Sequence, residues 1–386
     1  MFVCLAALAL AAVSVVDAAV LPIARRASVT GFVKTSGTNF TLNSEPYTVV
    51  GANSYWVGLM GLTTAEMDQA FSDIADAGAT TVRTWGFNDV TTPSGDYYQL
   101  WTNGTATINY GSTGLENFDN VVAAAKSYGI RLIVTLTNNW DNYGGMDVYV
   151  SQLTNTSYHD LFYTTPSIIA AYKSYVSAFV GRYVDEPGIL GWELANEPRC
   201  TGSTGVSTGN CTTTTITPWV EEMSAYIKSI DSNHLVGLGD EGFYNFPGAT
   251  DWPYAGGEGI DFNANLQVST IDFGTAHLYP GSWSESDPIP WGDTWIEYHA
   301  QSQHNYSKPV LLEEFGVLTN MTDTYTSWYS TVLSSGLAGD LIWQAGSYLA
   351  SGATPDDGFT IYPNNTIYQL EASSAQALKV RNGSPV

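Results

Sequence analysis

Short apolar runs rich in β-branched residues alternate with amphipathic segments along most of this chain. Eight of these runs have the length and composition of buried strands. They cover residues 48–52, 80–85, 131–137, 189–195, 235–240, 271–277, 309–314 and 340–343. Buried strands separated by helices imply parallel strands joined by crossovers, because both faces of such a sheet are covered.

Helix signals fill several of the intervals between these runs. One segment opens with a Thr63 and Glu66 capping pattern and closes at Gly78, and another begins just after Pro166. Eight strands alternating with helices predict an α/β fold, a (β/α)₈ TIM barrel in a single domain. An open doubly wound sheet is the alternative, but the first strand-to-helix turn lacks a glycine-rich phosphate cradle. The expected helices cover residues 63–78, 116–129, 167–184, 220–230 and 326–336.

The first residues of the chain predict secretion. Residues 1–18 form an apolar run of signal-peptide length with small residues near its end, too short and too rich in alanine for a membrane span. The dibasic Arg25-Arg26 marks the end of a short propeptide, residues 19–26. Residues 27–386 then form the catalytic barrel domain, and we expect no membrane association.

Charge and aromatic content narrow the choice of substrate. The formal net charge is −24, with only 13 Lys and Arg residues. Such a chain repels nucleic acids and anionic membranes, so a neutral substrate is expected. The 12 Trp and 24 Tyr residues supply rings that can stack on the apolar faces of sugars, although core packing explains most of them equally well.

Cysteine usage agrees with secretion. Cys4 lies in the leader, and Cys200 and Cys211 remain, separated by a Gly/Ser/Thr-rich stretch that a disulfide could close into a small loop. Zinc binding is the alternative, but two thiols without a nearby histidine make a poor site. Glycosylation sequons, which mark exposed loops in a secreted chain, occur at Asn39, Asn103, Asn155, Asn210, Asn305, Asn320, Asn364 and Asn382.

Polar, ionisable and aromatic residues gather where nearly every candidate strand ends. In a barrel, the carboxyl ends of the strands meet at one face and form the active site. From the second strand to the eighth, these end residues are Arg83 to Trp85, Asn138 to Trp140, Trp192 to Arg199, Asp240 and Glu241, His277 and Tyr279, Glu313 and Glu314, and Trp343.

Two of these residues are carboxylates on strands that face each other across a barrel, Glu197 and Glu314. Retaining glycosidases need such a pair about 5–5.5 Å apart, one as nucleophile and one as acid and then base. One group must be ionised while the other keeps its proton. We expect Arg83 to hold Glu314 as the anion, Tyr279 to donate a hydrogen bond to Glu314, and Asn196 to donate to a sugar 2-hydroxyl.

Glu313 and Glu314 are adjacent, and only one can be the nucleophile. Successive side chains on a strand point to opposite faces, so one should face the barrel axis and the other the surrounding helices. Glu314 directly precedes Phe315-Gly316, where the chain leaves the strand. We therefore expect Glu314 to be the inward, reacting carboxylate.

The strand ends lie within longer motifs. In chain order these are TTVRTWGFNDV, LTNNWDNYGG, GWELANEPRC, LGDEGF, HLYPGSW, KPVLLEEFG and IWQAG. In this order and spacing, over essentially the whole chain after the leader, they resemble the fungal-type endo-β-1,4-mannanases of glycoside hydrolase family 5. Asn-Glu-Pro at 196–198 and Glu-Phe-Gly at 314–316 are typical of the wider clan of retaining barrel enzymes. Arg199 and the NNWDNYGG segment point to mannanases within it.

The resemblance implies a secreted enzyme that cuts internal β-1,4-mannosidic bonds by double displacement, with Glu197 as acid/base and Glu314 as nucleophile. The expected partner is a mannan, galactomannan or glucomannan polysaccharide, and the protein is expected to be a monomer without cofactor or metal. For Glu241, a structural hydrogen bond is as good an expectation as substrate contact. The substrate-binding residues that the resemblance implies are Arg83, Trp140, Asn196, Arg199, Glu241, His277, Tyr279, Trp283 and Trp343.

Three other functions compete with this interpretation. A related retaining endo-β-glucanase would use the same machinery on glucose units. A barrel that binds carbohydrate without cleaving it would have no need of both Glu197 and Glu314. A metal-dependent hydrolase would need a His/Asp cluster at ligand spacing, which the sequence does not offer.

Overall fold

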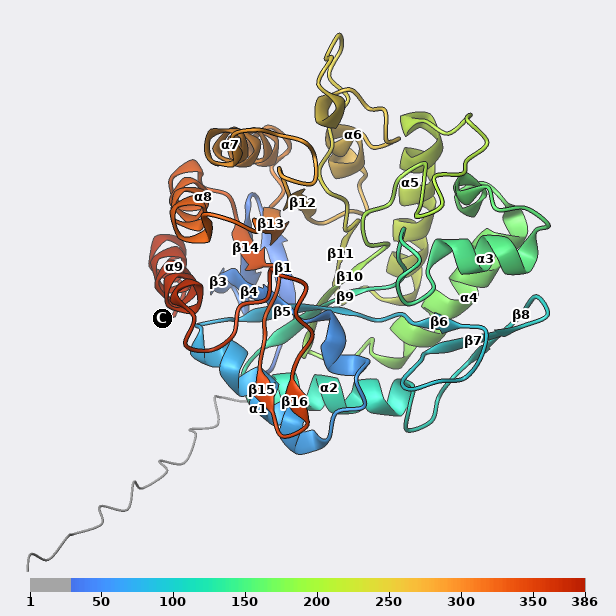
Figure 1. Ribbon diagram of the computed structural model, residues 1–386, viewed down its shortest axis with the longest axis horizontal. Coiled ribbons are helices and arrows are strands. Elements are labelled where there is room, and N and C mark those ends of the chain that lie inside the picture. The colour runs from blue at the N-terminus through green and yellow to red at the C-terminus, as the bar shows by residue number, and fades with distance from the viewer. Residues whose placement is uncertain (1–28, 386) are drawn as a thin grey trace, which may run out of the picture.

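The computed structural model describes residues 29–385. Eight parallel strands form one sheet in the order β11-β10-β9-β5-β4-β14-β13-β12, and helices surround it (Figure 1). All eight strands expected from the sequence are confirmed. Their bounds are β4 Val49–Asn53, β5 Thr81–Trp85, β9 Arg131–Thr135, β10 Ile189–Glu193, β11 Leu235–Gly237, β12 Gly274–Leu278, β13 Val310–Phe315 and β14 Gly339–Ile342.

The sheet closes into a barrel between β11 and β12 through single hydrogen bonds. Asp272 N–H donates to Val236 O at 2.8 Å, and His277 N–H donates to Glu241 O at 3.0 Å. The open doubly wound sheet is therefore excluded, and the expected (β/α)₈ barrel is confirmed.

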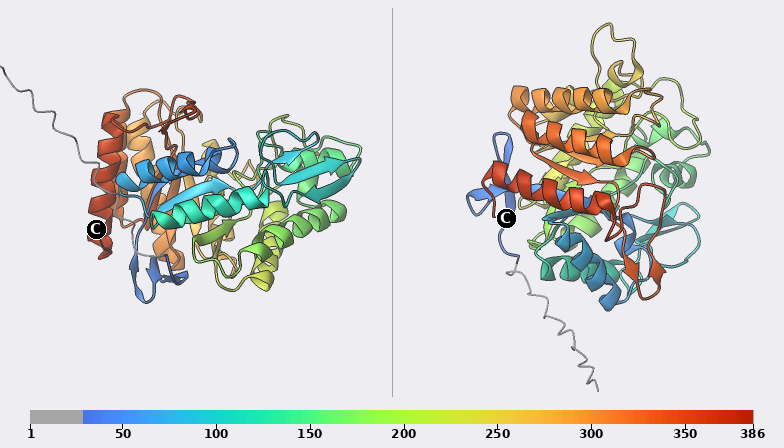
Figure 2. Two further views of the ribbon diagram at one scale, coloured as in Figure 1. Left: turned by 90° about the horizontal axis from the view of Figure 1, so that it is seen from below. Right: turned by 60° about the vertical axis from the view of Figure 1, so that its left-hand side comes forward.

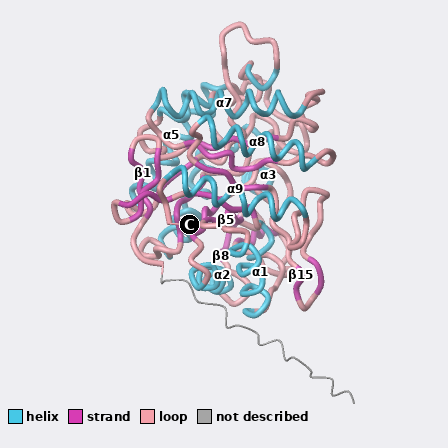
Figure 3. Tube along the Cα trace, turned by 90° about the vertical axis from the view of Figure 1, so that its left-hand side faces the viewer, coloured by secondary structure: helices cyan, strands magenta, loops and turns pink. Residues whose placement is uncertain are grey.

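The helices lie on the outside of the barrel, and α7, α8 and α9 lie side by side along one flank (Figure 3). The Thr63/Glu66 capping box and the Pro166 start are both present. Helix α5 begins earlier than expected, at Thr213, because Thr212 caps it. The helices are α1 Thr64–Asp76, α2 Leu115–Ser127, α3 Met146–Leu153, α4 Pro166–Arg182, α5 Thr213–Ile230, α6 Phe262–Gln267, α7 Pro288–Tyr306, α8 Met321–Ser335 and α9 Thr366–Asn382, with 3₁₀ turns η1 Tyr55–Gly58, η2 His159–Phe162 and η3 Trp252–Tyr254.

Three small sheets add to the barrel and are not predicted by the sequence pattern. The β1–β3 meander lies at the end of the molecule opposite the loop that carries β15 and β16 (Figure 2). Val33 and Phe40 of this meander pack on the apolar interior of the barrel, which includes Val49, Leu190 and Leu311. Their bounds are β1 Val33–Ser36, β2 Asn39–Leu42 and β3 Glu45–Tyr47; β6 Asp89–Val90, β7 Gln99–Thr102 and β8 Thr105–Ile108; and β15 Tyr348–Leu349 and β16 Gly352–Ala353.

The signal peptide and propeptide expected at residues 1–26 lie outside the described residues. Between residues 29 and 385, no helix combines the length and apolarity needed to cross a bilayer. Seven of the sequon asparagines are exposed, but Asn382 is half-buried and its Nδ2 donates to Thr48 Oγ1 at 3.1 Å. Asn382 therefore departs from the expectation that the sequons mark exposed loops.

Candidate active site

A pocket of about 790 Å³ opens where the barrel strands end at their carboxyl side. This volume is in the range of small-molecule sites in proteins. Nine of the eleven residues expected in the site line it, while Arg83 and His277 are fully buried behind it. The nine are Trp140, Asn196, Glu197, Arg199, Glu241, Tyr279, Trp283, Glu314 and Trp343.

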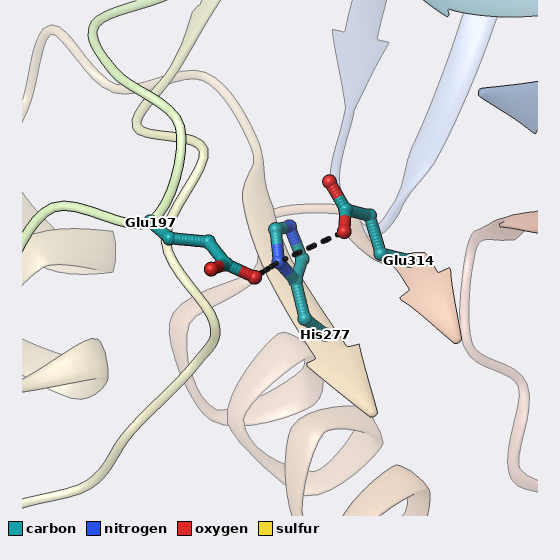
Figure 4. A group of neighbouring side chains, drawn as sticks. All are labelled: Glu197, His277 and Glu314. Carbon is teal, nitrogen blue, oxygen red and sulfur yellow. Dashed lines mark hydrogen bonds and ion pairs between the residues drawn. The ribbon is translucent and has the colours of Figure 1, made fainter. Parts of the chain in front are cut away.

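Glu197 and Glu314 face each other across this pocket with His277 between them (Figure 4). One carboxylate oxygen of each and a ring nitrogen of His277 all lie within 4.8 Å of one another. Inverting glycosidases hold their two carboxylates about 6.5–9.5 Å apart to admit a water, and retaining enzymes about 5–5.5 Å. The spacing here leaves no room for a water between the two groups and suits direct attack by one of them.

Glu314 is held by a cation and a phenol. Arg83 Nη1 donates to its Oε1 atom, and Tyr279 O–H donates to Oε2 at 2.8 Å. The same guanidinium donates to Glu193 at 2.8 Å and to Asn196 Oδ1 at 2.9 Å. Every nitrogen of the Arg83 guanidinium thus donates a hydrogen bond, and the fixed guanidinium holds the Glu314 carboxylate in one orientation.

The expectation that Glu313 and Glu314 point to opposite faces is wrong, because both carboxylates contact Arg83. The pairing of β12 with β13 shifts by one residue, from Ala276 with Leu312 to His277 with Glu314. Glu313 is thus the extra residue of a β-bulge. A bulge breaks the two-residue alternation and turns the next side chain. Glu314 consequently reaches the pocket while Glu313 stays beneath it.

Glu197 lies four residues past the end of β10, in a loop rather than on the strand. Trp140 Nε1 donates to its Oε2 at 2.6 Å, and His277 Nδ1 donates to its Oε1 at 2.7 Å. The φ of Glu197 is +48°, in the left-handed region that costs free energy for a residue with a side chain. Its N–H bond to Gly239 O, at 2.8 Å, and the bridge between Asn138 and Asn196 hold this conformation.

The pKa values of the two pocket carboxyls differ in the opposite direction from the expectation. Glu314 was expected to be the ionised group, but Glu197 has the lower pKa. Burial acts to raise the pKa of Glu197, but the hydrogen bond and charge of His277 lower it to about 2. Burial raises the pKa of Glu314, and His277 and Arg83 offset this only in part. Although burial opposes it, the charge of Glu314 and hydrogen bonds to Glu197 and Glu313 hold the pKa of His277 well above its usual value. The free site therefore keeps a proton on His277, which the sequence alone does not predict.

Arg199 and Glu241 act as a pair. Arg199 donates to both oxygens of Glu241, at 2.7 and 2.6 Å, and its guanidinium lies 4.9 Å from the ring centre of Phe243. Glu241 thus makes the structural contact expected of it and also lines the pocket, so contact with substrate stays a prediction. The Cys200–Cys211 disulfide predicted from the sequence is present directly after Arg199. In the chain-entropy model, closing so short a loop stabilises the fold by about 3 kcal/mol.

Aromatic rings wall the pocket on two sides. Trp343 stacks on Tyr55 with ring centres 5.7 Å apart and planes 10° apart, and its Nε1 donates to Asp357 at 2.8 Å. Trp252 Nε1 donates to the backbone oxygen of Trp283 at 3.2 Å on another wall. Flat, half-buried rings fixed by hydrogen bonds are suited to stacking on sugar rings.

Ten further residues line the pocket that were not among the eleven expected catalytic and substrate-binding residues. Trp85 and Asn138 were already identified from the sequence as strand-end residues. Tyr55 comes two residues after the first barrel strand, so the same rule applied to that strand would have found it. The others come from long loops whose course the sequence does not reveal. The ten are Tyr55, Trp85, Asn138, Asn142, Tyr143, Trp252, Glu258, Ser282, Asp357 and Phe359.

Comparisons with known proteins place this geometry in a family. The GH family 5 beta-mannosidase-like family model matches residues 30–335. The chain is 44% identical over 345 residues to mannan endo-1,4-beta-mannosidase A of Aspergillus aculeatus, covering 88% of each chain. It is 41% identical over 353 residues to mannan endo-1,4-beta-mannosidase A of Podospora anserina, covering 90% of this chain and 91% of that one.

Solved structures agree. The endo-1,4-beta-mannanase from Rhizomucor miehei matches with a TM-score of 0.85 at 42% identity, over 91% of this chain and 100% of that one. The hyperthermostable endo-1,4-beta-D-mannanase from Thermotoga petrophila matches with a TM-score of 0.76 at 34% identity, over 86% and 99%. Since the family model, the relatives and the fold all agree, the chain is a glycoside hydrolase that belongs to the β-mannosidase-like group of family 5.

Proposed function

We propose that this chain is a secreted endo-β-1,4-mannanase that cleaves internal mannosidic bonds with retention of configuration. The observation that carries the proposal is the close pair of carboxylates, Glu197 and Glu314, within 4.8 Å at the floor of an aromatic-walled pocket. The relatives named as mannan endo-1,4-beta-mannosidases support mannan as the polymer.

In this mechanism Glu314 attacks the anomeric carbon and forms a covalent glycosyl-enzyme, while Glu197 protonates the departing oxygen. Glu197 then removes a proton from the water that releases the sugar. Arg83 and Tyr279, which bind both oxygens of Glu314, orient it for attack and stabilise it again when it leaves. Trp343 offers the ring face beneath the sugar that reacts.

The substrate is tested by assaying galactomannan, carboxymethylcellulose and xylan side by side. We expect galactomannan solutions to lose viscosity faster than reducing ends accumulate, as internal cleavage requires, with little action on the other two polymers. Comparable rates on carboxymethylcellulose and galactomannan would overturn the mannanase assignment and favour the endo-β-glucanase alternative. No cleavage of any polymer, together with binding, would favour a non-catalytic barrel.

The stereochemistry is tested by following the first product with NMR. Double displacement gives the β-anomer first, which then equilibrates with the α-anomer. An α-anomer at the earliest times would contradict it.

Secretion has its own test, which is to sequence the amino terminus of protein collected from the medium. The chain should begin after residue 18 or, if the dibasic site is used, after residue 26.

A further inference from the structure

Two further carboxyl groups lie behind the pocket and take no part in the mechanism above. Glu193 and Glu313 are fully buried, and neither lines the pocket. Glu193 Oε2 accepts from Arg83 Nε at 2.8 Å and from Thr135 Oγ1 at 2.7 Å. Glu313 Oε2 lies 3.4 Å from Arg83 Nε and 3.4 Å from His277 Nε2.

Carboxyl groups outnumber cations in the site cluster, by which we mean Arg83, His277 and the four carboxyls that contact them. One of these carboxyls must therefore keep a proton. In the part of the chain that the structure describes, the four carboxyls form ion pairs with only two groups, Arg83 and His277. An uncompensated buried charge costs several kcal/mol. The charge of Arg199 also acts on Glu197, but Arg199 forms its ion pair with Glu241, so that pair leaves the excess unchanged. Asp240, three residues past β11, does not reduce it either, since burial raises its pKa to about 7. The four carboxyls are Glu193, Glu197, Glu313 and Glu314.

The contacts show which of the two inner carboxyls holds the proton. Glu193 receives two short hydrogen bonds, whereas Glu313 has only the two 3.4 Å contacts. The Oε1 atoms of both are buried, and neither receives a hydrogen bond from any other donor. A proton on Glu313, donated to Glu193, satisfies both atoms. Burial and the charge of Glu193 raise the pKa of Glu313, whereas Arg83 outweighs burial and lowers that of Glu193.

His277 joins this inner pair to the pocket. Its Nδ1 contacts Glu197 at 2.7 Å and its Nε2 contacts Glu313 at 3.4 Å. The hydrogen bond at one ring nitrogen of a histidine decides which proton the other can release. We propose that Glu313 is a positioning residue for the acid/base step: it accepts the Nε2 proton of His277 and so makes the Nδ1 proton the one that moves to Glu197.

The proton balance of this step is closed. The Nδ1 proton of His277 passes to Glu197 Oε1, and Glu197 gives it to the oxygen of the leaving sugar as that bond breaks. When water attacks the glycosyl-enzyme, Glu197 takes a proton from the water and returns one to Nδ1. His277 Nε2 keeps its proton throughout. Glu313 also keeps its proton, which it donates in a hydrogen bond to Glu193. This inference rests on the proposed function only for the identity of the reaction.

The kinetic test compares substitutions of the two inner carboxyls. A glutamine at 313 still donates to Glu193 and accepts from His277, so we expect Glu313→Gln to recover most of the activity that Glu313→Ala loses. For Glu313→Ala we expect kcat to fall about 10–100-fold with KM within about twofold, and the alkaline limb of the pH profile to move lower. A glutamine at 193 that turns its carbonyl oxygen to Arg83 and Thr135 sets its NH₂ group against the Glu313 O–H, and it removes the negative charge opposite Arg83. Glu193→Gln should therefore lose more activity than Glu313→Gln.

Two outcomes would overturn the proposal: equal losses in Glu313→Gln and Glu313→Ala, or a milder effect from Glu193→Gln than from Glu313→Gln. The matched control is Glu371→Gln, which replaces a buried carboxyl of α9 that does not line the pocket and should leave the pH profile of kcat in place. If Glu313→Ala does not fold, the two glutamine variants still decide the matter.

A second readout needs no substrate. Nitrogen-15 NMR follows the charge and tautomer of the five histidines, with the His277 signals assigned by their loss in His277→Asn. We expect a His277 cation that loses its Nδ1 proton first, and that does so about one pH unit lower in Glu313→Ala. Loss from Nε2 first in the wild-type protein would refute the inference. If these spectra hold but mannan is not cleaved, it is the proposed function that fails.

Discussion

The barrel buries carboxyl groups in two places and treats them differently. In the site cluster, Arg83 and His277 provide the positive charge for the carboxyls around them. On the outer side, Asp340 of β14 and Glu371 of α9 form an acid pair between strand and helix, both buried. Burial raises the pKa of Asp340 to about 7, and Arg381 offsets this only in part. Burial and the charge of Asp340 raise the pKa of Glu371 well above its usual range.

The difference shows what buried cations achieve. With Arg83 present, carboxylates can stay ionised inside the protein, as the proposed roles of nucleophile and proton acceptor require. Where a cation offsets burial only in part, the acid pair stays neutral by keeping its protons and contributes to packing alone. Activity should therefore be lost as pH falls, when Glu314 is protonated, whereas stability should be lost as pH rises and the acid pair is forced to ionise.

The largest expected effect comes from removing Glu314, the proposed nucleophile. Glu314→Ala should lower kcat about 10⁴-fold or more, with little change in Tm, because the side chain is held by contacts that serve catalysis. Azide should restore cleavage of an activated mannoside, with inverted configuration. Full activity in the purified variant would overturn the assignment of Glu314.

Replacing the guanidinium of Arg83 should have the next largest effect. Lysine cannot reproduce the fork through which Arg83 binds Glu193, Asn196 and Glu314. We expect Arg83→Lys to lower kcat/KM about 10²–10³-fold. The matched variant is Arg381→Lys, since Arg381 donates to backbone oxygens near the end of α8. It should lower Tm and leave kcat/KM within about twofold; equal kinetic losses in both would contradict the comparison.

The smallest effect concerns stability and pH. Asp340 titrates near 3.8 in the unfolded chain and at about 7 in the folded one, so the folded state binds more protons between these values. The free energy of unfolding must then fall as pH rises through this window. Asp340→Asn removes the dependence at this site, and we expect its Tm relative to wild type to rise by about 2–5 °C between pH 4 and pH 8. Calorimetry across this range checks it, and a constant difference would contradict it.

The acid limb of the activity profile completes the contrast. Because burial raises the pKa of Glu314, the fall of kcat/KM on the acid side should be centred above 4.5, the usual value of a glutamate. Asp340→Asn should not move this limb. A shift of the limb in that variant would show that the two clusters are coupled through β13 and β14, which pair along the barrel.

Several features followed from the sequence because they depend on local pattern. Apolar runs predict buried strands, and the parallel strands of a barrel place their carboxyl ends together. The sequence alone therefore identified Glu197, Glu314, Tyr279 and Trp343 as pocket residues. The Cys200–Cys211 pairing followed from two thiols within one short loop. Each of these inferences uses residues close in sequence or a rule that holds for every barrel.

Other features were decided only by the tertiary structure. The bulge at Glu313 turns two adjacent carboxyls to the same side, and no alternation rule predicts where a strand adds a residue. The charge on His277 depends on burial and on acids from β13 and from the loop after β10, so the position of His277 in the sequence carries no information about it. Trp252 and Asp357 reach the pocket from loops whose paths are set by packing. The chain by itself thus determined the barrel and the position of Glu197 and Glu314 at its pocket, while the three-dimensional packing decided where their protons are held.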